Sequence, residues 1–247
     1  MLNRTEGIVL KNTVFGEADL IVTYLTCDFG LLNVFAKSPR KIKSRFGSSL
    51  EPLTYSTLSF IGKEDAGLPR LTQSDIIRPF HTLREDFRCF VSISEMLELN
   101  LHFLPERENN EEIFELLLNT LLKIESDRGN KLLYLYYKIK FLEITGYLPR
   151  LDACGRCGRK PVSNGSNNFY ISHGSIICNT CIGSDSDAIK LSHSAARFYK
   201  SILQWHFTAL DRIKAPENLL TEIACVMDSH IRYMLVKPLK SSDFSKI

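Results

Sequence analysis

Two cysteine pairs constrain the fold of this chain more than any other feature of its sequence. Cys154-Gly-Arg-Cys157 and Cys178-Asn-Thr-Cys181 are CxxC motifs with twenty residues between Cys157 and Cys178. They lie in the segment 150–188, which is rich in glycine, serine and asparagine and has few large apolar residues. Such a segment cannot bury enough apolar surface to fold by itself. We therefore expect a cross-link among the four thiols to stabilise it.

The spacing of these thiols is typical of a zinc site with four cysteine ligands. Two intervening residues let both thiolates of a pair face one ion, and Gly158 allows a tight turn behind it. His173-Gly174 predicts a two-residue hairpin turn that brings the second pair back beside the first. Four thiolates leave a zinc ion no open position for water, so its role should be structural. The predicted ligands are Cys154, Cys157, Cys178 and Cys181.

Two other interpretations of the cysteine quartet stay open. A pair of disulfides would also cross-link the segment, but a reducing cytosol disfavours disulfides. An unmetallated or redox-active quartet is the other alternative. The remaining cysteines, Cys27, Cys89 and Cys225, have apolar neighbours in the sequence and are expected in the core.

The first eighty residues are predicted to form five strands. These strands are rich in β-branched and aromatic residues, and turn residues separate them. Their predicted ranges are 6–11, 20–26, 31–36, 53–61 and 71–77. Five short strands with this punctuation indicate a small barrel or sandwich.

From about Leu83 onward the apolar residues recur at helical spacing. The predicted helices cover 83–104, 113–123, 132–145, 192–207 and 216–235. The second is apolar nearly all round and is expected to be buried, and the third ends at Gly146 as a glycine C-cap predicts. The fold class is therefore α+β. We expect a barrel domain at 1–80 and a helical domain at 81–247, with 150–188 inserted in the latter.

The segment between the third and fourth predicted strands is strongly basic. It contains five cations and no acid between Lys37 and Phe46: Lys37, Arg40, Lys41, Lys43 and Arg45. Like charges at this density repel one another unless solvent or a polyanion screens them. The pattern favours phosphate binding, with Phe46 offering its ring to a base. The alternative is a solvated loop with Phe46 in the core. The net charge of +3 is too mild to decide between them.

Other functional classes find little support in the sequence. Hydrophobic residues make up 44% and charged residues 24%, as in ordinary folded proteins. No apolar run approaches the ~20 residues of a membrane span, and the first residues do not resemble a secretory signal, so a cytoplasmic location is expected. The phosphate-binding loop, dinucleotide fingerprint, metalloprotease and serine-hydrolase motifs are missing, so we do not expect an enzyme.

Several short motifs occur in an order that is specific when taken together. They are Thr5-Glu-Gly-Ile-Val-Leu, Gly16-Glu-Ala-Asp-Leu-Ile-Val, Thr26-Cys-Asp-Phe-Gly30, Leu50-Glu-Pro, Leu148-Pro-Arg-Leu-Asp-Ala-Cys154 and Pro238-Leu-Lys-Ser-Ser-Asp-Phe. In this order the chain resembles the bacterial RecO family of recombination mediators over nearly its whole length. It departs from the family at Ser38, where glycine is usual after Ala-Lys.

The resemblance implies an N-terminal OB-fold and a helical domain that carries a zinc ribbon. It also implies binding of single- and double-stranded DNA, strand annealing, partnership with RecR and with the C-terminal tail of the single-strand-binding protein, and help in loading RecA. It further implies a nucleoid-associated protein of the bacterial cytoplasm with no membrane partner. The residues alone leave other classes open: an RNA-binding OB/zinc-ribbon protein, a protein-interaction scaffold, or a hydrolase.

Overall fold

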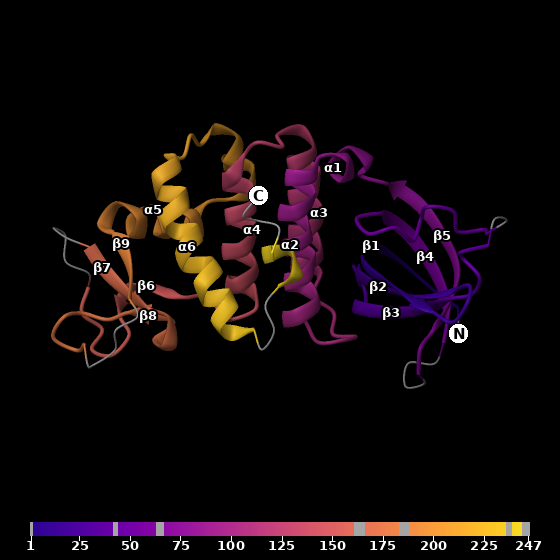
Figure 1. Cartoon of the computed structure of the whole chain (residues 1–247), viewed down its shortest axis with the longest axis horizontal. Coiled ribbons are helices and arrows are strands. Elements are labelled where there is room, and N and C mark those ends of the chain that lie inside the picture. Colours follow the sequence, from indigo (N-terminus) through magenta and orange to yellow (C-terminus); the bar gives the residue numbers. More distant parts are fainter. Residues whose placement is uncertain are drawn as a thin grey trace. The chain divides into compact units, whose positions relative to one another are not determined.

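The computed structural model describes six stretches of the chain, 2–41, 44–62, 67–160, 166–182, 188–235 and 239–243. The chain divides into two units (Figure 1). One comprises Met1–Gly129 together with Lys240–Ile247, and the other comprises Asn130–Leu239. None of the helices among the described residues is long and apolar enough to cross a membrane.

The first unit contains a closed five-stranded barrel. Its strands are β1 (Leu2–Phe15), β2 (Asp19–Thr26), β3 (Gly30–Ala36), β4 (Tyr55–Ile61) and β5 (Arg70–Arg78). They follow the order β1-β2-β3-β5-β4, and β4 pairs back to β1. Neighbours are antiparallel except β3 and β5, which pair in parallel at Phe35 and Arg70. This is an OB-like barrel, which confirms the predicted fold class.

Alternation of apolar and polar residues explains why these segments form a barrel. Successive side chains of a strand point to opposite faces, so every second residue enters the core. Val22 and Tyr24 of β2 are fully buried, as are Val34 of β3 and Leu58 of β4. Phe46, from the loop between β3 and β4, completes the same apolar cluster.

A segment outside the five strands covers the beginning of β3, where β3 does not pair with β5. The Arg107 N–H donates to the Leu31 carbonyl (2.9 Å), and the Asn33 amide donates to Glu106 (2.7 Å). Gly30, at the start of β3, has φ +58°, and a Cβ there would lie 1.8 Å from the Glu108 carbonyl oxygen. Only glycine allows the segment to approach this closely.

Three helices follow the barrel in the first unit: α1 (His81–Glu85), α2 (Phe87–Phe103) and α3 (Glu111–Ser126). The prediction of one helix from Leu83 to Leu104 is wrong. Asp86 is extended, and its carboxylate accepts the Cys89 N–H (3.1 Å), so it caps a new helix at Phe87. Arg78 of β5 joins this layer to the barrel through Glu125 of α3 (2.7 Å).

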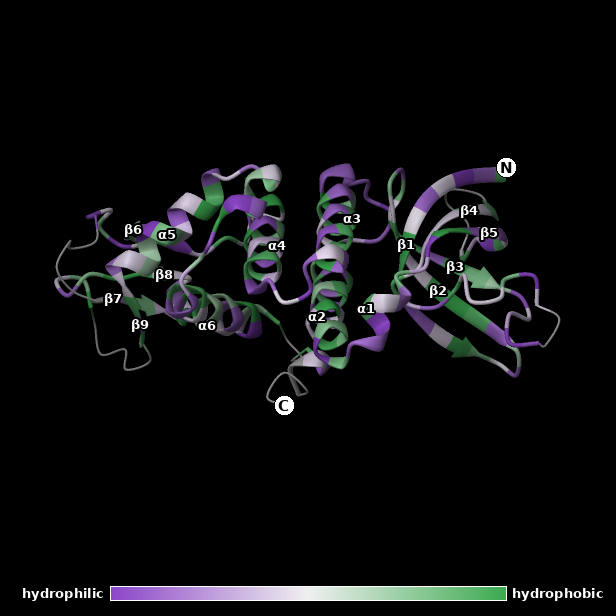
Figure 2. Cartoon of the chain, turned by 90° about the horizontal axis from the view of Figure 1, so that it is seen from above, coloured by the Kyte–Doolittle hydropathy of each residue, from purple (hydrophilic) through white to green (hydrophobic). Residues whose placement is uncertain are grey.

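The predicted all-round burial of the second helix is also wrong. In α3, Glu112 and Glu115 are exposed, and hydrophilic and hydrophobic residues alternate along its ribbon (Figure 2). Only the face with Ile113, Leu117 and Leu121 is buried. The prediction failed because Glu115 and Asn119, within 113–123, fall on one side of the helix, which is exposed.

The second unit combines helices with a small sheet. The helices are α4 (Lys131–Ile144), α5 (His193–Gln204) and α6 (Glu217–Met234). The strands, in spatial order, are β6 (Arg150–Cys154), β8 (Ser175–Ile176), β7 (Ser166–Tyr170) and β9 (Ala188–Ser192). Short 3-10 helices occur at Ile171–His173, Phe207–Arg212 and Lys240–Asp243, the last within the first unit.

The helix that is buried nearly all round is α4. Even Lys138 is only 8% exposed, and its ammonium group pairs with Asp228 of α6 (2.7 Å). Gly146 follows α4 with φ +79°, as the predicted glycine C-cap requires. The unit therefore has its own core, against which the small sheet can pack.

Candidate metal centre and nucleic-acid interface

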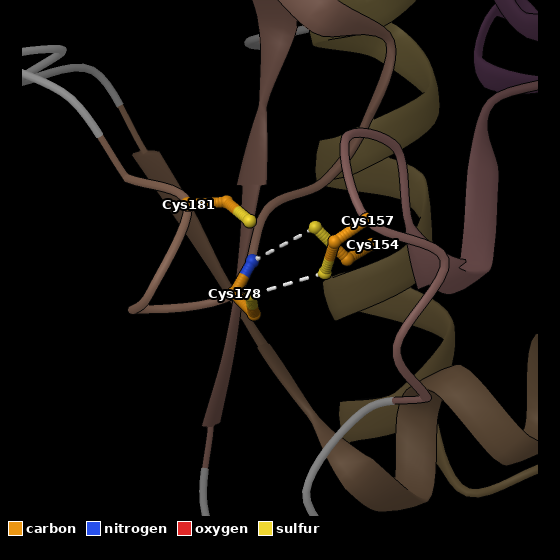
Figure 3. A group of neighbouring side chains, drawn as sticks. All are labelled: Cys154, Cys157, Cys178 and Cys181. Carbon is orange, nitrogen blue, oxygen red and sulfur yellow. Dashed lines mark hydrogen bonds between the residues drawn. The ribbon is translucent and has the colours of Figure 1, made fainter.

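The four predicted ligands converge in the second unit (Figure 3). The Sγ atoms of Cys154, Cys157, Cys178 and Cys181 all lie within 4.8 Å of one another. The Cys157 and Cys178 sulfurs are 3.6 Å apart. Four sulfurs bound tetrahedrally at ~2.3 Å from a zinc ion would be separated by about 3.8 Å. The cluster therefore has the size and the donor atoms of a metal site.

Two tight turns bring each pair of cysteines to this point. Gly158, with φ +71°, donates its N–H to the Cys154 carbonyl (2.9 Å). The Cys181 N–H donates in the same way to Cys178 (2.9 Å). A Cβ on Gly155 would lie 2.1 Å from the Ser175 Oγ, so the first turn can pack against β8 only with glycine there.

The hairpin between the two pairs differs in detail from the prediction. Tyr170 of β7 pairs with Ser175 of β8, so four residues connect the strands and not two. Ile171–His173 form a 3-10 turn, and Gly174 closes it with φ +54°. The prediction took Gly174 as part of a two-residue turn, but the chain makes an extra helical turn before the left-handed residue.

The electrostatics of the cluster favour a thiolate at Cys154 and oppose a thiolate at Cys181. The Cys178 N–H donates to the Cys154 sulfur (3.4 Å), and this bond is the main reason that the pKa of Cys154 falls to about 6. Hydrogen bonds with the sulfurs of Cys157 and Cys178 raise the pKa of Cys181 to about 12. Full deprotonation of the cluster therefore requires a cation to offset the repulsion between thiolates.

The cysteines outside the cluster only partly match the prediction. Cys89 is buried, Cys27 is partly exposed and Cys225 is exposed. The core location predicted for Cys225 is wrong, because Cys225 lies on the exposed side of α6 while Ile223 and Val226 point inward.

The basic loop, residues 37–45, lies on the first unit. Lys37, Arg40, Lys41 and Arg45 are exposed. Among the described residues, no carboxylate lies within ion-pair distance of any of the four. Lys43, the fifth predicted cation, lies outside the described residues. The described part of the loop thus presents positive charge that no other described residue neutralises.

Hydrogen bonds fix the first half of the basic loop to the turn between β1 and β2. The Ser38 N–H donates to the Asp19 carboxylate (2.6 Å), and the Arg40 N–H donates to the Ala18 carbonyl (3.3 Å). The Arg40 guanidinium also donates to the Glu17 carbonyl (3.2 Å). Ser38 has φ +56°, a left-handed conformation that glycine adopts without strain.

Phe46 does not offer its ring to a base, which was the first of its two predicted roles. Its side chain is only 3% exposed and packs in the barrel core with Leu50. The Arg45 guanidinium covers its ring at 4.8 Å. The prediction that Phe46 stacks on a base is wrong, because Phe46, which directly follows the basic loop, is packed into the core.

Comparison with known proteins gives the family. The family model described as "Recombination protein O N terminal" matches residues 1–80, and the one described as "Recombination protein O C terminal" matches 84–243. The chain belongs to the RecO family. The resemblance noted in the sequence is thereby confirmed.

Relatives of the RecO family match over almost the full length of the chain. The DNA repair protein RecO of Thermodesulfovibrio yellowstonii is 49% identical and covers 92% of this chain and 91% of its own. That of Dehalococcoides mccartyi (strain 195) is 33% identical, with 96% and 92% covered. That of Bacillus pumilus is 31% identical, with 99% and 93% covered.

One exposed aromatic residue of this RecO-family barrel, Phe15, was not among the predicted site residues. Phe15 at the end of β1 is 53% exposed, and its ring meets that of Phe35 of β3. The available signal was strand alternation, since Val34 and Ala36 point into the barrel and Phe35 must then point out. The cations beside Phe46 favoured that residue as the stacking ring instead.

Proposed function

We propose that this RecO-family chain binds single-stranded DNA on its barrel and promotes the pairing of complementary strands. The observation that carries the proposal is the exposed basic loop, held against an OB-like barrel, with no acidic partner among the described residues. OB-folds commonly bind single strands along one face and its connecting loops. Membership of a DNA repair family supports DNA as the ligand.

The proposed mechanism is electrostatic and needs no covalent step. Lys37, Arg40, Lys41, Lys43 and Arg45 neutralise phosphates and release their counterions, which supplies most of the affinity. Neutralised strands repel each other less, so complementary bases can meet and pair. Double-stranded DNA can bind through the same phosphate contacts.

The proposed partners follow from the family and not from the geometry. We propose that the chain works with RecR, contacts the acidic C-terminal tail of the single-strand-binding protein, and thereby helps RecA to load onto coated DNA. An acidic tail and a DNA backbone are both polyanions, so the basic loop and other cationic surfaces suit such partners.

The binding proposal can be tested by replacing the five loop cations with alanine. The plot of log affinity for an oligonucleotide against log salt concentration should flatten by about 3.5 units, since each contact with a single strand contributes ~0.7. A matched control replaces five exposed cations of the second unit: Lys190, Arg197, Lys200, Arg212 and Lys214. Both variants lose the same charge, so only a specific loop site separates their slopes. Equal slopes in the two variants would reject the loop as the binding site.

Two titrations separate this proposal from its alternatives. DNA and RNA of one sequence, titrated side by side, should show tighter binding of DNA. Tighter binding of RNA would favour an RNA-binding protein. If neither nucleic acid binds while a partner protein does, the chain is an interaction scaffold.

We also propose that the cysteine cluster holds one structural zinc ion. Metal analysis of the purified chain should give one zinc per chain, and Cys157→Ser should lose it. Cys225→Ser is a matched control, because Cys225 is also exposed but lies outside the cluster. If Cys157→Ser retained full zinc and the wild-type melting temperature, the assignment would be wrong.

A further inference from the structure

The outer face of the barrel carries an aromatic pair, Phe15 and Phe35, that lies outside the barrel core. Phe15 is 53% exposed, and its ring lies edge-to-face against Phe35, with 5.9 Å between centroids and 87° between planes. Phe35 is only partly buried. A ring as large as that of Phe15 leaves much apolar surface in water unless something covers it.

Strand register places Phe35 on a continuous outward row, and Phe15 lies two residues beyond the first member of this row, Thr13, on the same face of β1. Thr13 of β1 pairs with Ile21 of β2, Ile21 pairs with Phe35, and Phe35 pairs with Arg70 of β5. All four side chains are exposed or partly exposed, whereas the alternate residues of β2 and β3 enter the core. The row therefore combines apolar surface with a cation at one end.

The charge around the pair is mostly positive. Lys11, Lys37 and Arg70 are exposed and have no ion-pair partner among the described residues. Among the described residues, the acids closest to Phe15 in the sequence are Glu17 and Asp19. The Asp19 carboxylate is engaged by the Ser38 N–H (2.6 Å), which ties the basic loop to the turn directly after Phe15. A ligand on Phe15 is thus beside the loop proposed to hold phosphates.

We infer that Phe15, supported edge-on by Phe35, stacks on a base of single-stranded DNA. The inference rests on the proposed function and adds to it the surface that contacts bases. Unpaired cations next to an exposed ring suit a polyanion with flat apolar groups, and single-stranded nucleic acid is such a polymer. A duplex buries the faces of its bases and cannot use this ring. Phe46, buried in the core, cannot take this role.

The first test compares two oligomers of equal length on the wild-type protein at one salt concentration. One is oligothymidylate, and the other is an abasic deoxyribose-phosphate chain with the same charge. We expect oligothymidylate to bind about 5- to 150-fold more tightly for one stacked base. Equal binding would overturn the inference without using any variant.

The second test assigns the preference to Phe15. Phe15→Ala should lose the preference for oligothymidylate and leave the salt slope unchanged, whereas Phe15→Trp should keep both. Tyr233→Ala is the control, since Tyr233 is 61% exposed but lies on α6 in the second unit. A preference that survives in Phe15→Ala would place stacking elsewhere and overturn the inference.

The outcomes for the two proposals are distinct. If Phe15→Ala behaves as wild type while the loop variant loses its salt slope, the charge mechanism stands and the stacking surface does not. If wild type binds neither oligomer, both proposals fail. A surface meant for a protein partner would bind that partner but show no preference between the two oligomers, and this result also overturns the inference.

Discussion

The close packing of residues 106–108 against β3 gives a stringent test of how this segment covers the barrel. Gly30→Ala would place a Cβ 1.8 Å from the Glu108 carbonyl oxygen, at a residue with φ +58°. The left-handed conformation costs a non-glycine residue about 1–2 kcal/mol. Moving the covering segment would also weaken the hydrogen bond from Arg107 to Leu31, worth ~0.5–1.5 kcal/mol. Alanine also reduces the conformational freedom of the unfolded chain, and this offsets the loss by ~0.4–1 kcal/mol. The expected net loss is about 0.5–3 kcal/mol.

The assay must report on the barrel and not on the whole chain. The single tryptophan, Trp205, belongs to the second unit, so its fluorescence is unsuitable. Hydrogen exchange of peptides from β3 and from residues 104–110 during urea titration follows the right region. The control is Gly129→Ala, because Gly129 has no heavy atom within 4 Å of an added Cβ and no positive φ. Equal protection of β3 in the two variants would refute the close packing of this segment.

Three further changes test other parts of the structure. Ser38→Gly relieves a left-handed residue at φ +56° and should stabilise the chain by about 0.5–1 kcal/mol in urea denaturation, with unchanged DNA affinity. Burial lowers the pKa of His230 below its ordinary 6.5, so the unfolded chain takes up the proton first. The contribution of His230 to the free energy of unfolding should therefore be constant above pH 6.5. Below pH 6.5 it should decrease by at most about 1.36 kcal/mol per pH unit, as measured by melting at a series of pH values. His230→Gln, which keeps a donor for the Tyr147 carbonyl, should remove this component. Gly155→Ala should lower zinc content, because its Cβ would meet the Ser175 Oγ, whereas Gly129→Ala should not.

The parts of the fold that were predictable depend on local rules. The five strands follow from alternation and turn residues, which act within a few positions of one another. The metal cluster follows from spacing, because two intervening residues constrain how a pair of thiolates can turn toward one point. The end of α4 at Gly146 is likewise a local property of glycine.

The parts that were not predictable depend on contacts between distant residues. Covering of β3 by residues 106–108 joins segments more than seventy positions apart, and no periodicity in either segment signals it. The break at Asp86 arises because an N-cap competes with continuation of the helix, and the sequence allows both. The burial of Phe46 has the same origin, since composition does not tell which aromatic of a barrel faces inward.

The burial of Phe46 changes how the basic loop should be understood. A solvated loop rich in cations would lose conformational freedom on binding DNA, and that loss would reduce its affinity. Here Phe46 fixes one end of the loop in the core, and Ser38 and Arg40 fix the other end to the β1–β2 turn. For these anchored residues at the two ends of the loop, the ordering entropy is therefore lost during folding. Under the proposed function, the charges supply most of the affinity and set how steeply it depends on salt, while the anchors lower the entropy cost of binding.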